Sequence, residues 1–365
     1  MLFDKVKNRL GFGCMRLKMI GEEVDLEEFS RMIDAFISAG FNYFDTAHGY
    51  IGGKSEVAIR ECLTKRYNRE DYFLANKLSD WYFEREEDII PLFESQLKQC
   101  GVDYFDVYFF HCMTRKAYEK HKSCNTFEII KGLKAKGRIR HIAMSFHDTA
   151  EVLDKILTER PFIEFVQLQF NYLDYDDPGV QSKACYDVAV KHKKKIIVME
   201  PVRGGYLVNL PKEAQRLFDS FGKGSYASYA LRFAASFPEV HMVLSGMNDM
   251  DMLRDNISTF KNFEPLSKKE LLATDKAREI IREARQIPCT ACSYCTEVCP
   301  KRIPIPELFS TYNKVLGARI TRGQAKEEFP KGKSGACDCI KCGKCEKVCP
   351  QGIEIRKNLE AIAKI

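Results

Sequence analysis

The sequence contains no run of 18 or more apolar residues, the length at which a transmembrane helix becomes a candidate. Its first residues, MLFDKVKNRLGFG, also lack the apolar core of a signal peptide. The composition is otherwise that of a globular protein, with 45% hydrophobic and 30% charged residues in a chain of 365. We therefore expect a cytoplasmic protein with no membrane association, long enough for a barrel of about 250 residues and an additional domain.

The sequence also lacks a repeated basic stripe with interleaved aromatic residues, so we expect no nucleic-acid partner. The formal net charge is +6, and this surplus lies wholly in residues 289–365, which hold 14 Lys and Arg against 8 Asp and Glu. The basic residues there are interspersed with cysteines. They favour a solvated surface or a docking patch for an acidic electron-transfer protein.

Cysteine, by contrast, is abundant and unevenly placed. Nine of the 15 cysteines fall between residues 289 and 349. In a cytosolic protein such clustering indicates metal binding rather than disulfides. Two runs, 289–300 and 339–350, repeat the spacing C-x2-C-x2-C-x3-C-P. A structural zinc site takes only four ligands and would leave several of these thiols unused.

This spacing is typical of chains that bind two [4Fe–4S] clusters, in which the fourth cysteine of each run binds the other cube. The predicted ligands of the first cluster, cluster I, are Cys289, Cys292, Cys295 and Cys349. Those of the second, cluster II, are Cys339, Cys342, Cys345 and Cys299. Cys337 fits neither run and is expected to be a spare thiol.

The 39 residues between Cys299 and Cys339 include PELFSTYNKVLGAR, which has the pattern of a short amphipathic helix. This length resembles the helical ferredoxin domains of respiratory oxidoreductase subunits. We therefore predict a small, mainly helical ferredoxin-like domain over residues 289–365. A charged amphipathic helix within residues 263–288 would link it to the preceding domain.

Residues 1–262 alternate short apolar runs, such as NYFDTA and KIIVMEP, with segments of helical periodicity. Eight such strands with eight helices predict an α/β fold, a (β/α)8 TIM barrel. Residues around His121 and Lys122 are expected to form a polar loop.

Catalytic residues of such barrels lie where the strands end. Three predicted strands end in polar residues that form a proton-delivering set: Asp45, Tyr50, Lys77 and His111. A lysine beside a tyrosine lowers the tyrosine's pKa towards the range of a general acid, and a carboxylate holds the lysine. An imidazole then faces both.

These four residues resemble, in type, order and strand position, the catalytic tetrad of the aldo-keto reductases, and FDTAHGYIGGKSE resembles the family's signature. The resemblance runs from about Arg9 to about Ile257. The whole chain looks like the subgroup with a C-terminal [4Fe–4S] domain. The resemblance implies that Tyr50 protonates a substrate carbonyl, Lys77 lowers its pKa, Asp45 pairs with Lys77, and His111 orients the carbonyl.

The family also binds NAD(P)H, and here the match is partial. Residues that correspond to, or could serve as, cofactor contacts are Ser145, Gln167, Arg203, Gly204 and Asn256. The aromatic residue that stacks on the nicotinamide is replaced by Met199, and a serine near the pyrophosphate by Glu200. No Arg or Lys stands where a 2′-phosphate partner is expected, so a preference for NADPH lacks its electrostatic basis.

Three functions remain open. The first is an iron–sulfur oxidoreductase that reduces a carbonyl, or oxidises an alcohol, with electrons from NAD(P)H, the clusters or both. The second is a ferredoxin-coupled enzyme independent of nicotinamide, in which a flavin could split electron pairs, although no flavin motif stands out. The third is an electron-transfer protein whose barrel is a scaffold. The first two imply a small carbonyl or alcohol as substrate.

Overall fold

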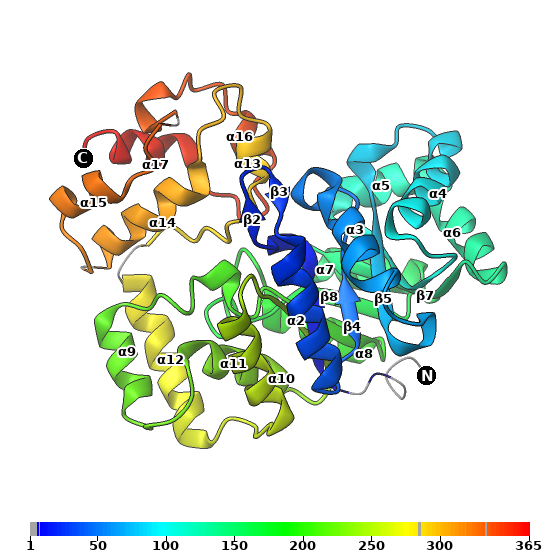
Figure 1. Cartoon of the computed structure of the whole chain (residues 1–365), viewed down its shortest axis with the longest axis horizontal. Helices are drawn as coiled ribbons and strands as arrows, with labels where there is room; N and C mark the ends of the chain where they lie inside the picture. The colour runs from blue at the N-terminus through cyan, green and yellow to red at the C-terminus, as the bar shows by residue number, and fades with distance from the viewer. Residues whose placement is uncertain (1–5, 7, 284–285, 318, 333) are drawn as a thin grey trace. The chain divides into compact units, whose positions relative to one another are not determined.

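The computed structural model describes residues 6, 8–283, 286–317, 319–332 and 334–365 (Figure 1). The chain divides into two compact units. The first comprises Met1–Pro201 with Leu231–Pro265, and the second comprises Val202–Ala230 with Leu266–Ile365. The division differs from the expected boundaries because Val202–Ala230 groups with the C-terminal part. Residues 284–285 of the predicted linker lie outside the described residues.

Eight parallel strands of the first unit close into a barrel, which confirms the predicted fold. Each strand coincides with one of the predicted apolar runs. Around the barrel the strands are β1 (Leu10–Gly13), β10 (Val240–Gly246), β9 (Lys195–Met199), β8 (Phe165–Gln169), β7 (Ile139–Phe146), β6 (Phe105–Met113), β5 (Phe73–Ser79) and β4 (Tyr43–Asp45).

Amphipathic helices connect the barrel strands. In α2, for example, Asp25 caps the N-terminus through the Glu28 N–H, and Phe29, Ile33 and Phe36 are buried. The connecting helices include α2 (Leu26–Ser38), α3 (Lys54–Ile59), α4 (Ile89–Cys100), α5 (Arg115–Ser123), α6 (Thr126–Ala135), α7 (Ala150–Glu159), α8 (Ser182–Lys191), α10 (Tyr226–Ala235) and α11 (Met250–Lys261). None of the described helices has the length and apolar character that a membrane span requires.

Two elements of the first unit differ from the sequence prediction. A short antiparallel hairpin, β2 (Met19–Ile20) with β3 (Glu23–Val24), follows the first barrel strand. The expected polar loop around His121 is instead helix α5, whose buried face carries Ala117, Tyr118 and His121.

The barrel interior is filled by side chains from seven of its strands. Its buried cluster consists of Tyr43, Phe73, Ala75, Val107, Phe109, Ala143, Phe165, Ile197, Met242 and Leu244. Because alternate residues of a strand point to the same face, the residue two positions after an interior one also points inward. The interior is therefore a packed core, and the next inward layer lies at the carboxyl ends of the strands.

The second unit is mainly helical, as predicted. It contains η7 (Arg203–Gly205), α9 (Lys212–Asp219), α12 (Lys268–Glu283), α13 (Tyr294–Glu297), α14 (Ile305–Leu316), α15 (Arg322–Glu328), η8 (Ala336–Asp338), α16 (Lys344–Lys347) and α17 (Ile355–Ile362). Helices α9 and α12 pack together, and so do α14 and α17. Its apolar core includes Ile303, Phe309, Ile353 and Leu359.

The two cysteine runs have the same backbone conformation, 50 residues apart. Ala291 and Lys341 have φ of 54° and 58°, and Ser293 and Gly343 have φ of 67° and 71°. Each run continues into a short helix, α13 or α16, and these two helices pack against each other. The module is therefore an internal repeat with two matching halves.

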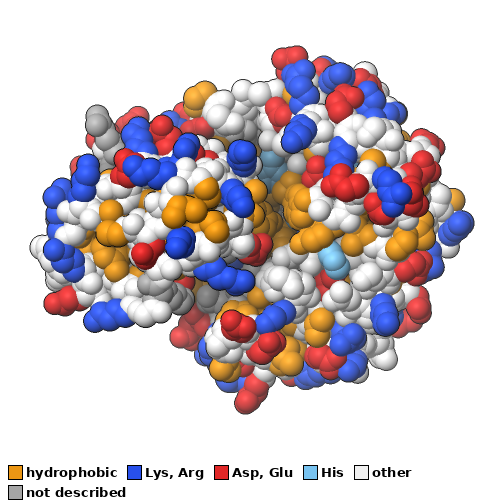
Figure 2. Space-filling view, turned by 90° about the horizontal axis from the view of Figure 1, so that it is seen from above, with side chains coloured by type: hydrophobic (Ala, Val, Ile, Leu, Met, Phe, Trp, Pro, Cys, Tyr) orange, Lys and Arg blue, Asp and Glu red, His pale blue; other side chains and the backbone are white. Residues whose placement is uncertain are grey.

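On the face drawn in Figure 2, Lys and Arg side chains are mixed with Asp and Glu side chains and with apolar ones. No field of a single charge sign covers that face.

Candidate active site and thiolate cavity

The inward layer at the carboxyl ends of the barrel strands is polar. Asp45 stands two residues after the interior Tyr43, Lys77 two after Ala75, and His111 two after Phe109. The same step leads to further members of the layer: Ser145 after Ala143, Gln167 after Phe165 and Met199 after Ile197. Most of the predicted site residues of the first unit thus share one layer because they share one strand register.

Asp45 and Lys77 form a buried ion pair on the neighbouring strands β4 and β5. Lys77 Nζ lies 2.5 Å from Asp45 Oδ1 and 2.8 Å from the carbonyl oxygen of Thr46, and both side chains are less than 5% exposed. Burial raises the pKa of the Asp45 carboxyl, while the Lys77 ammonium opposes that rise. A buried charge of this kind is stable only with its partner, so the pair fixes the position of the Lys77 ammonium.

Tyr50 lies on the turn that follows β4, η2 (Tyr50–Gly53), and is 9% exposed. Lys77 Nζ is 4.8 Å from the centre of the Tyr50 ring. The ring of His111 meets that of Tyr50 edge-on, with 6.0 Å between centroids. The structure therefore brings together all four members of the predicted tetrad.

His111 is oriented by Ser79, a residue that the sequence reasoning missed. Ser79 Oγ lies 2.6 Å from His111 Nδ1, and the two residues are register partners on β5 and β6. Burial, and secondarily the Lys77 charge, hold the pKa of His111 well below its ordinary value. The imidazole is therefore neutral near pH 7. Because Ser79 stands two residues after Lys77 on one strand, alternation could have identified it.

A second buried network supports the segment that carries Tyr50. Glu56 on α3 is fully buried; its carboxylate lies 2.8 Å from His48 Nδ1 and accepts a 2.7 Å hydrogen bond from Asn76 Nδ2. The His48 ring in turn meets Tyr82 edge-on at 4.9 Å. The contact between His48 and Glu56 thus joins the residues that precede and follow Tyr50 in sequence and restrains the loop between them.

Three residues predicted to contact the nicotinamide cofactor lie in the first unit. Ser145 and Gln167 are register partners on β7 and β8, and both are almost fully buried. Ser145 Oγ accepts a 2.8 Å hydrogen bond from the Cys112 N–H. The side-chain amide of Asn256, on α11, donates a 2.8 Å hydrogen bond to Ser245 Oγ.

Glu200 follows β9 directly, at the position where the resemblance to the aldo-keto reductases implies a serine near the pyrophosphate. Glu200 has a left-handed backbone conformation, with φ of 55°, and its carboxylate pairs with Arg16 at 2.8 Å. A carboxylate beside a phosphate is a like-charge contact and raises the free energy of binding. Because Arg16 balances the Glu200 carboxylate, this position offers a phosphate a neutral ion pair rather than a net positive charge.

Arg203 and Gly204 belong to the second unit, where they contact the segments that carry cysteines. Gly204 has φ of 62°, and a Cβ placed on it would lie 2.0 Å from the carbonyl oxygen of Thr290. Arg203 is 6% exposed and donates a 3.3 Å hydrogen bond to Gln351. The space next to the Gly204 backbone, which the missing side chain leaves open, is therefore filled by the Thr290 peptide. No space remains there for a phosphate.

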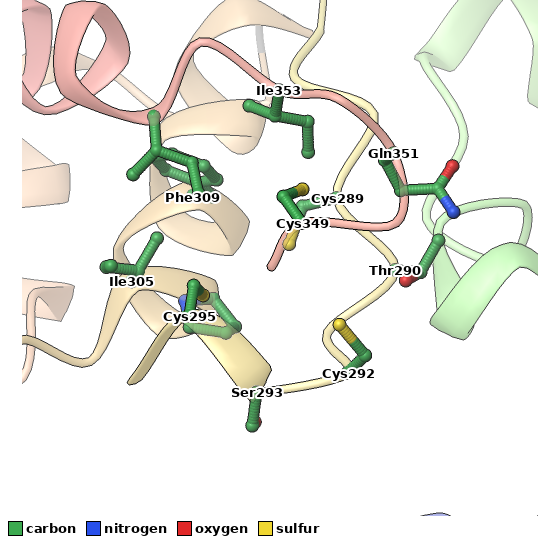
Figure 3. A pocket seen from close by; sticks show the side chains of 12 residues that line it. Cys289, Thr290, Cys292, Ser293, Cys295, Ile305, Phe309, Cys349, Gln351 and Ile353 are labelled. Atoms are coloured by element: carbon green, nitrogen blue, oxygen red, sulfur yellow. The ribbon is translucent and has the colours of Figure 1, made fainter. Parts of the chain in front are cut away.

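Thiols from both cysteine runs converge on one cavity of the second unit (Figure 3). Cys289, Cys292, Cys295 and Cys349 line it, together with apolar residues such as Phe309. Burial raises the pKa of Cys295 to about 12, with smaller contributions from Cys292, Cys289 and Cys349. Four cysteines around an apolar cavity match the donor set of a [4Fe–4S] cluster, and they are the four predicted for cluster I.

The cysteines predicted for cluster II occupy the matching half of the module. Cys345 is buried on α16, Cys299 and Cys339 are partly buried against the module's core, and Cys342 is exposed. Cys337 is also exposed, and its thiol reaches only the carbonyl oxygen of Ala363, at 4.0 Å.

Comparison with known proteins agrees with this geometry. The model of the Aldo/keto reductase family matches residues 9–279, and that of the 4Fe-4S dicluster domain matches residues 288–354. An uncharacterized oxidoreductase of Bacillus subtilis, YqkF, is 23% identical over 299 residues, which cover 73% of this chain and 91% of YqkF. The 4-dihydromethyl-trisporate dehydrogenase of Mucor mucedo is 35% identical over 114 residues, covering 30% of this chain and 32% of that protein.

Solved structures show the same barrel. The aldo-keto reductase AKR11C1 from Bacillus halodurans, in its holo form, aligns with a TM-score of 0.62 and 24% identity over 74% of this chain and 91% of that one. An aldo-keto reductase from Klebsiella pneumoniae in complex with NADPH aligns with a TM-score of 0.59 and 17% identity over 73% and 90% of the two chains. With its barrel and its dicluster domain, this chain belongs to the aldo/keto reductase family and is an oxidoreductase that carries a 4Fe-4S domain.

Proposed function

We propose that this chain is a cytoplasmic oxidoreductase that reduces a small carbonyl compound, or oxidises the corresponding alcohol, with Tyr50 as the proton donor and iron–sulfur clusters as the electron source. The observation that supports this proposal most directly is the contact of Tyr50 with the buried Lys77–Asp45 pair and with His111. An isolated tyrosine would carry no such set of partners. A barrel that served only as a scaffold would gain little from an ion pair buried next to Tyr50, because taking two charges out of water costs free energy.

The tetrad's partners define a role for each residue. Lys77, held by Asp45, favours the charged form of the phenol next to it and so makes Tyr50 a better proton donor. We assign the Ser79 hydroxyl as donor to His111 Nδ1. The Nε2–H of the neutral imidazole then donates a hydrogen bond to the substrate carbonyl oxygen, which orients it for protonation by Tyr50.

The electrons come, in this proposal, from the two clusters. Reduction of a carbonyl to an alcohol takes two electrons and two protons. Tyr50 would give one proton to the oxygen and solvent the other to the carbon, while each bound cluster would supply one electron at a time. Cys289, Cys292, Cys295 and Cys349 would hold cluster I. Cys339, Cys342, Cys345 and Cys299 would hold cluster II. Their thiolates, and the core packed behind them, are the chain's own contribution.

A nicotinamide cofactor is the second candidate source of electrons. The register pair Ser145 and Gln167, and a structural neighbour in complex with NADPH, favour it. The Glu200 carboxylate and the contact between Gly204 and Thr290 oppose it, since both occupy the phosphate end of such a site. We therefore place the clusters first. A flavin has no supporting contact among the described residues.

The replacement Tyr50→Phe tests the proton donor. With dithionite-reduced protein and an aromatic aldehyde as the probe, we expect turnover to fall by about 10²–10⁴-fold, the usual contribution of a positioned general acid. The matched control Tyr82→Phe removes a hydroxyl near Gly49, keeps the ring that meets His48, and should keep its turnover. The visible absorption of the clusters should be the same in both variants. Unchanged turnover in Tyr50→Phe would exclude the tetrad mechanism.

Titration with NADH and NADPH tests the electron source. We expect neither dinucleotide to bind to the anaerobically purified protein, as followed by nicotinamide fluorescence. Two results together would contradict the clusters as electron source: binding of either dinucleotide, and carbonyl reduction by protein from which the clusters have been removed. The enzyme would then be nicotinamide-dependent.

A further inference from the structure

The internal repeat of the iron–sulfur module allows its two clusters to be compared position by position. With the offset of 50 residues, Thr290 corresponds to Ile340 and Gln351 to Lys301. Arg302 and Gly352 also correspond, and both have left-handed backbones, with φ of 49° and 60°. The residues beside cluster I therefore have exact counterparts in position beside cluster II.

The face of cluster I at Thr290 and Gln351 is covered by another segment of the second unit. Thr290 is 3% exposed, and its peptide lies against Gly204; Gln351 accepts a hydrogen bond from Arg203. In Figure 3 both residues lie on the side of the cavity that faces the green segment. The segment that provides this cover is the turn η7.

The matching face of cluster II has no such cover. Ile340, the counterpart of Thr290, is 57% exposed, and Lys301, the counterpart of Gln351, is exposed as well. Cys342 is also exposed, whereas its counterpart Cys292 is partly buried. The two halves thus differ in their exposure to solvent. The chain covers the face next to Thr290 and Gln351, and the corresponding face next to Ile340 and Lys301 is exposed.

The open face has the composition of a transient docking surface. The two segments that carry the exposed Ile340 and Lys301 also carry exposed basic side chains: Lys301, Arg302, Lys341, Lys344 and Lys347. Lys341 is paired with Glu360, at 2.6 Å. Lys301, Arg302, Lys344 and Lys347 are exposed and have no carboxylate partner within the part of the chain that the structure describes. An apolar centre with a charged rim is typical of protein interfaces.

From these contacts we infer that the face formed by Lys301, Arg302, Ile340, Cys342, Lys344 and Lys347 docks an acidic one-electron carrier protein. The carrier would lose one electron to the cluster held by Cys339, Cys342, Cys345 and Cys299, and two such events would supply the pair that the proposed carbonyl reduction consumes. This inference rests on the proposed function for the use of the electrons. A symmetric contact between this face and the same face of a second copy is disfavoured because the two basic surfaces would repel each other.

Charge reversal on α16 tests the inference. The full-length protein with both clusters is mixed in a stopped-flow instrument with a reduced, acidic bacterial ferredoxin, and reduction of the clusters is followed by their visible absorption. In Lys344→Glu/Lys347→Glu we expect the second-order rate constant to fall at least tenfold at low ionic strength, because like charges then meet at the encounter. Added salt should slow the wild type and narrow the difference between the two proteins.

Two controls make the result specific. Lys98→Glu/Lys136→Glu changes the net charge equally on exposed lysines of the barrel unit and should react within twofold of the wild type. The iron content of every variant shows whether its clusters are intact. Equal rates in the two double variants, or faster electron exchange of the wild type with a basic cytochrome c than with the ferredoxin, would overturn the inference.

The outcomes also separate this inference from the proposed function. If dithionite reduces the clusters and supports carbonyl reduction but the ferredoxin does not react, the docking face is wrong and the proposed function stands. If the ferredoxin reduces the clusters through this face but no electrons reach a carbonyl, the docking face stands and the proposed function fails.

Discussion

His121 is a buried histidine without a role in the candidate site, and it makes the barrel sensitive to acid. Its ring is fully buried among Phe83, Phe110 and Phe127, and Nδ1 lies 2.9 Å from Thr126 Oγ1. Burial, and secondarily Lys120, lower the pKa of His121 to about 3, against 6.5 in an unfolded chain. The unfolded state therefore binds this proton first as the pH falls. The contribution of the neutral His121 to the unfolding free energy is fully present above pH 6.5 and is lost progressively between pH 6.5 and about 3.

We predict that His121→Phe flattens this acid dependence. A phenyl ring suits the aromatic surroundings, and Thr126 Oγ1 retains its hydrogen bond to the carbonyl oxygen of His121. Between pH 6.5 and pH 5 the wild type should lose about 2 kcal/mol more unfolding free energy than the variant, from 1.36 kcal/mol per pKa unit. Urea denaturation of the barrel at both pH values measures the difference.

Thr126→Val is the matched control for this prediction. It removes the side-chain partner of the ring but leaves the titrating group in place. This variant should be less stable than the wild type at pH 7 and should keep the wild type's decline towards pH 5. The same decline in His121→Phe would show that another group, such as His111, is responsible.

Individual site residues differed in how far the sequence could predict them. Asp45, Tyr50, Lys77 and His111 could be found because strand ends concentrate polar residues at one edge of a barrel. Alternation along β5 could have placed Ser79 in the inward layer, but its contact with His111 could not be read from the sequence. The same holds for the contact of Glu56 with His48, which joins a helix to the loop after a strand.

At the scale of elements, the eight barrel strands were predictable because each is a short apolar run between polar segments. Helix α5 was not, because its sequence, RKAYEKHKS, buries only three side chains and is otherwise charged. The hairpin of β2 and β3 was also missed, since its strands have only two residues each. Short or highly charged elements take their structure from tertiary contacts that a local pattern does not contain.

The turn η7 provides a prediction at this scale. Gly204→Ala places a methyl group into the Thr290 peptide and also forces a left-handed backbone on alanine. We expect a loss of about 2–5 kcal/mol, from about 1–2 kcal/mol of backbone strain and about 1–3 kcal/mol of overpacking. The unfolding free energy of the second unit, followed through loss of the clusters' visible absorption, is the measurement.

Gly205→Ala is the control for the steric part. Gly205 also has a positive φ, of 89°, but a Cβ there would meet no atom within 4 Å. Its cost should therefore be the backbone strain alone, of about 1–2 kcal/mol. Equal losses in the two variants would mean that the approach of Gly204 to Thr290 contributes nothing to stability.

At the scale of the whole molecule, the sequence separated a barrel from an iron–sulfur module but not the grouping of the residues between them. Val202–Ala230 follows a barrel strand, so continuity along the chain assigned it to the barrel. Its grouping with the second unit depends on contacts of Gly204 with Thr290 and of α9 with α12, which join residues far apart in sequence. No local pattern carries that information.

The crossing of ligands between the two cysteine runs is the strongest constraint on the module as a whole, and paired replacements can test it. If Cys349 binds the same cube as Cys289, Cys289→Ala/Cys349→Ala removes two ligands from cluster I only. Cys345→Ala/Cys349→Ala then removes one ligand from each cluster. We predict that the first variant retains about four irons per chain and that the second retains fewer, because both of its sites are incomplete.

Ligation within each run would reverse this order, since Cys345 and Cys349 would then belong to one cube and Cys289 to the other. Iron and sulfide analysis of anaerobically purified protein therefore distinguishes the two arrangements without any assumption about the substrate. The cavity lined by Cys289, Cys292, Cys295 and Cys349 is the reason to expect the crossed result. Crossing also makes each cube hold both halves of the repeat together. Loss of either cluster should thus lower the stability of the entire module, including the half whose own three cysteines are intact.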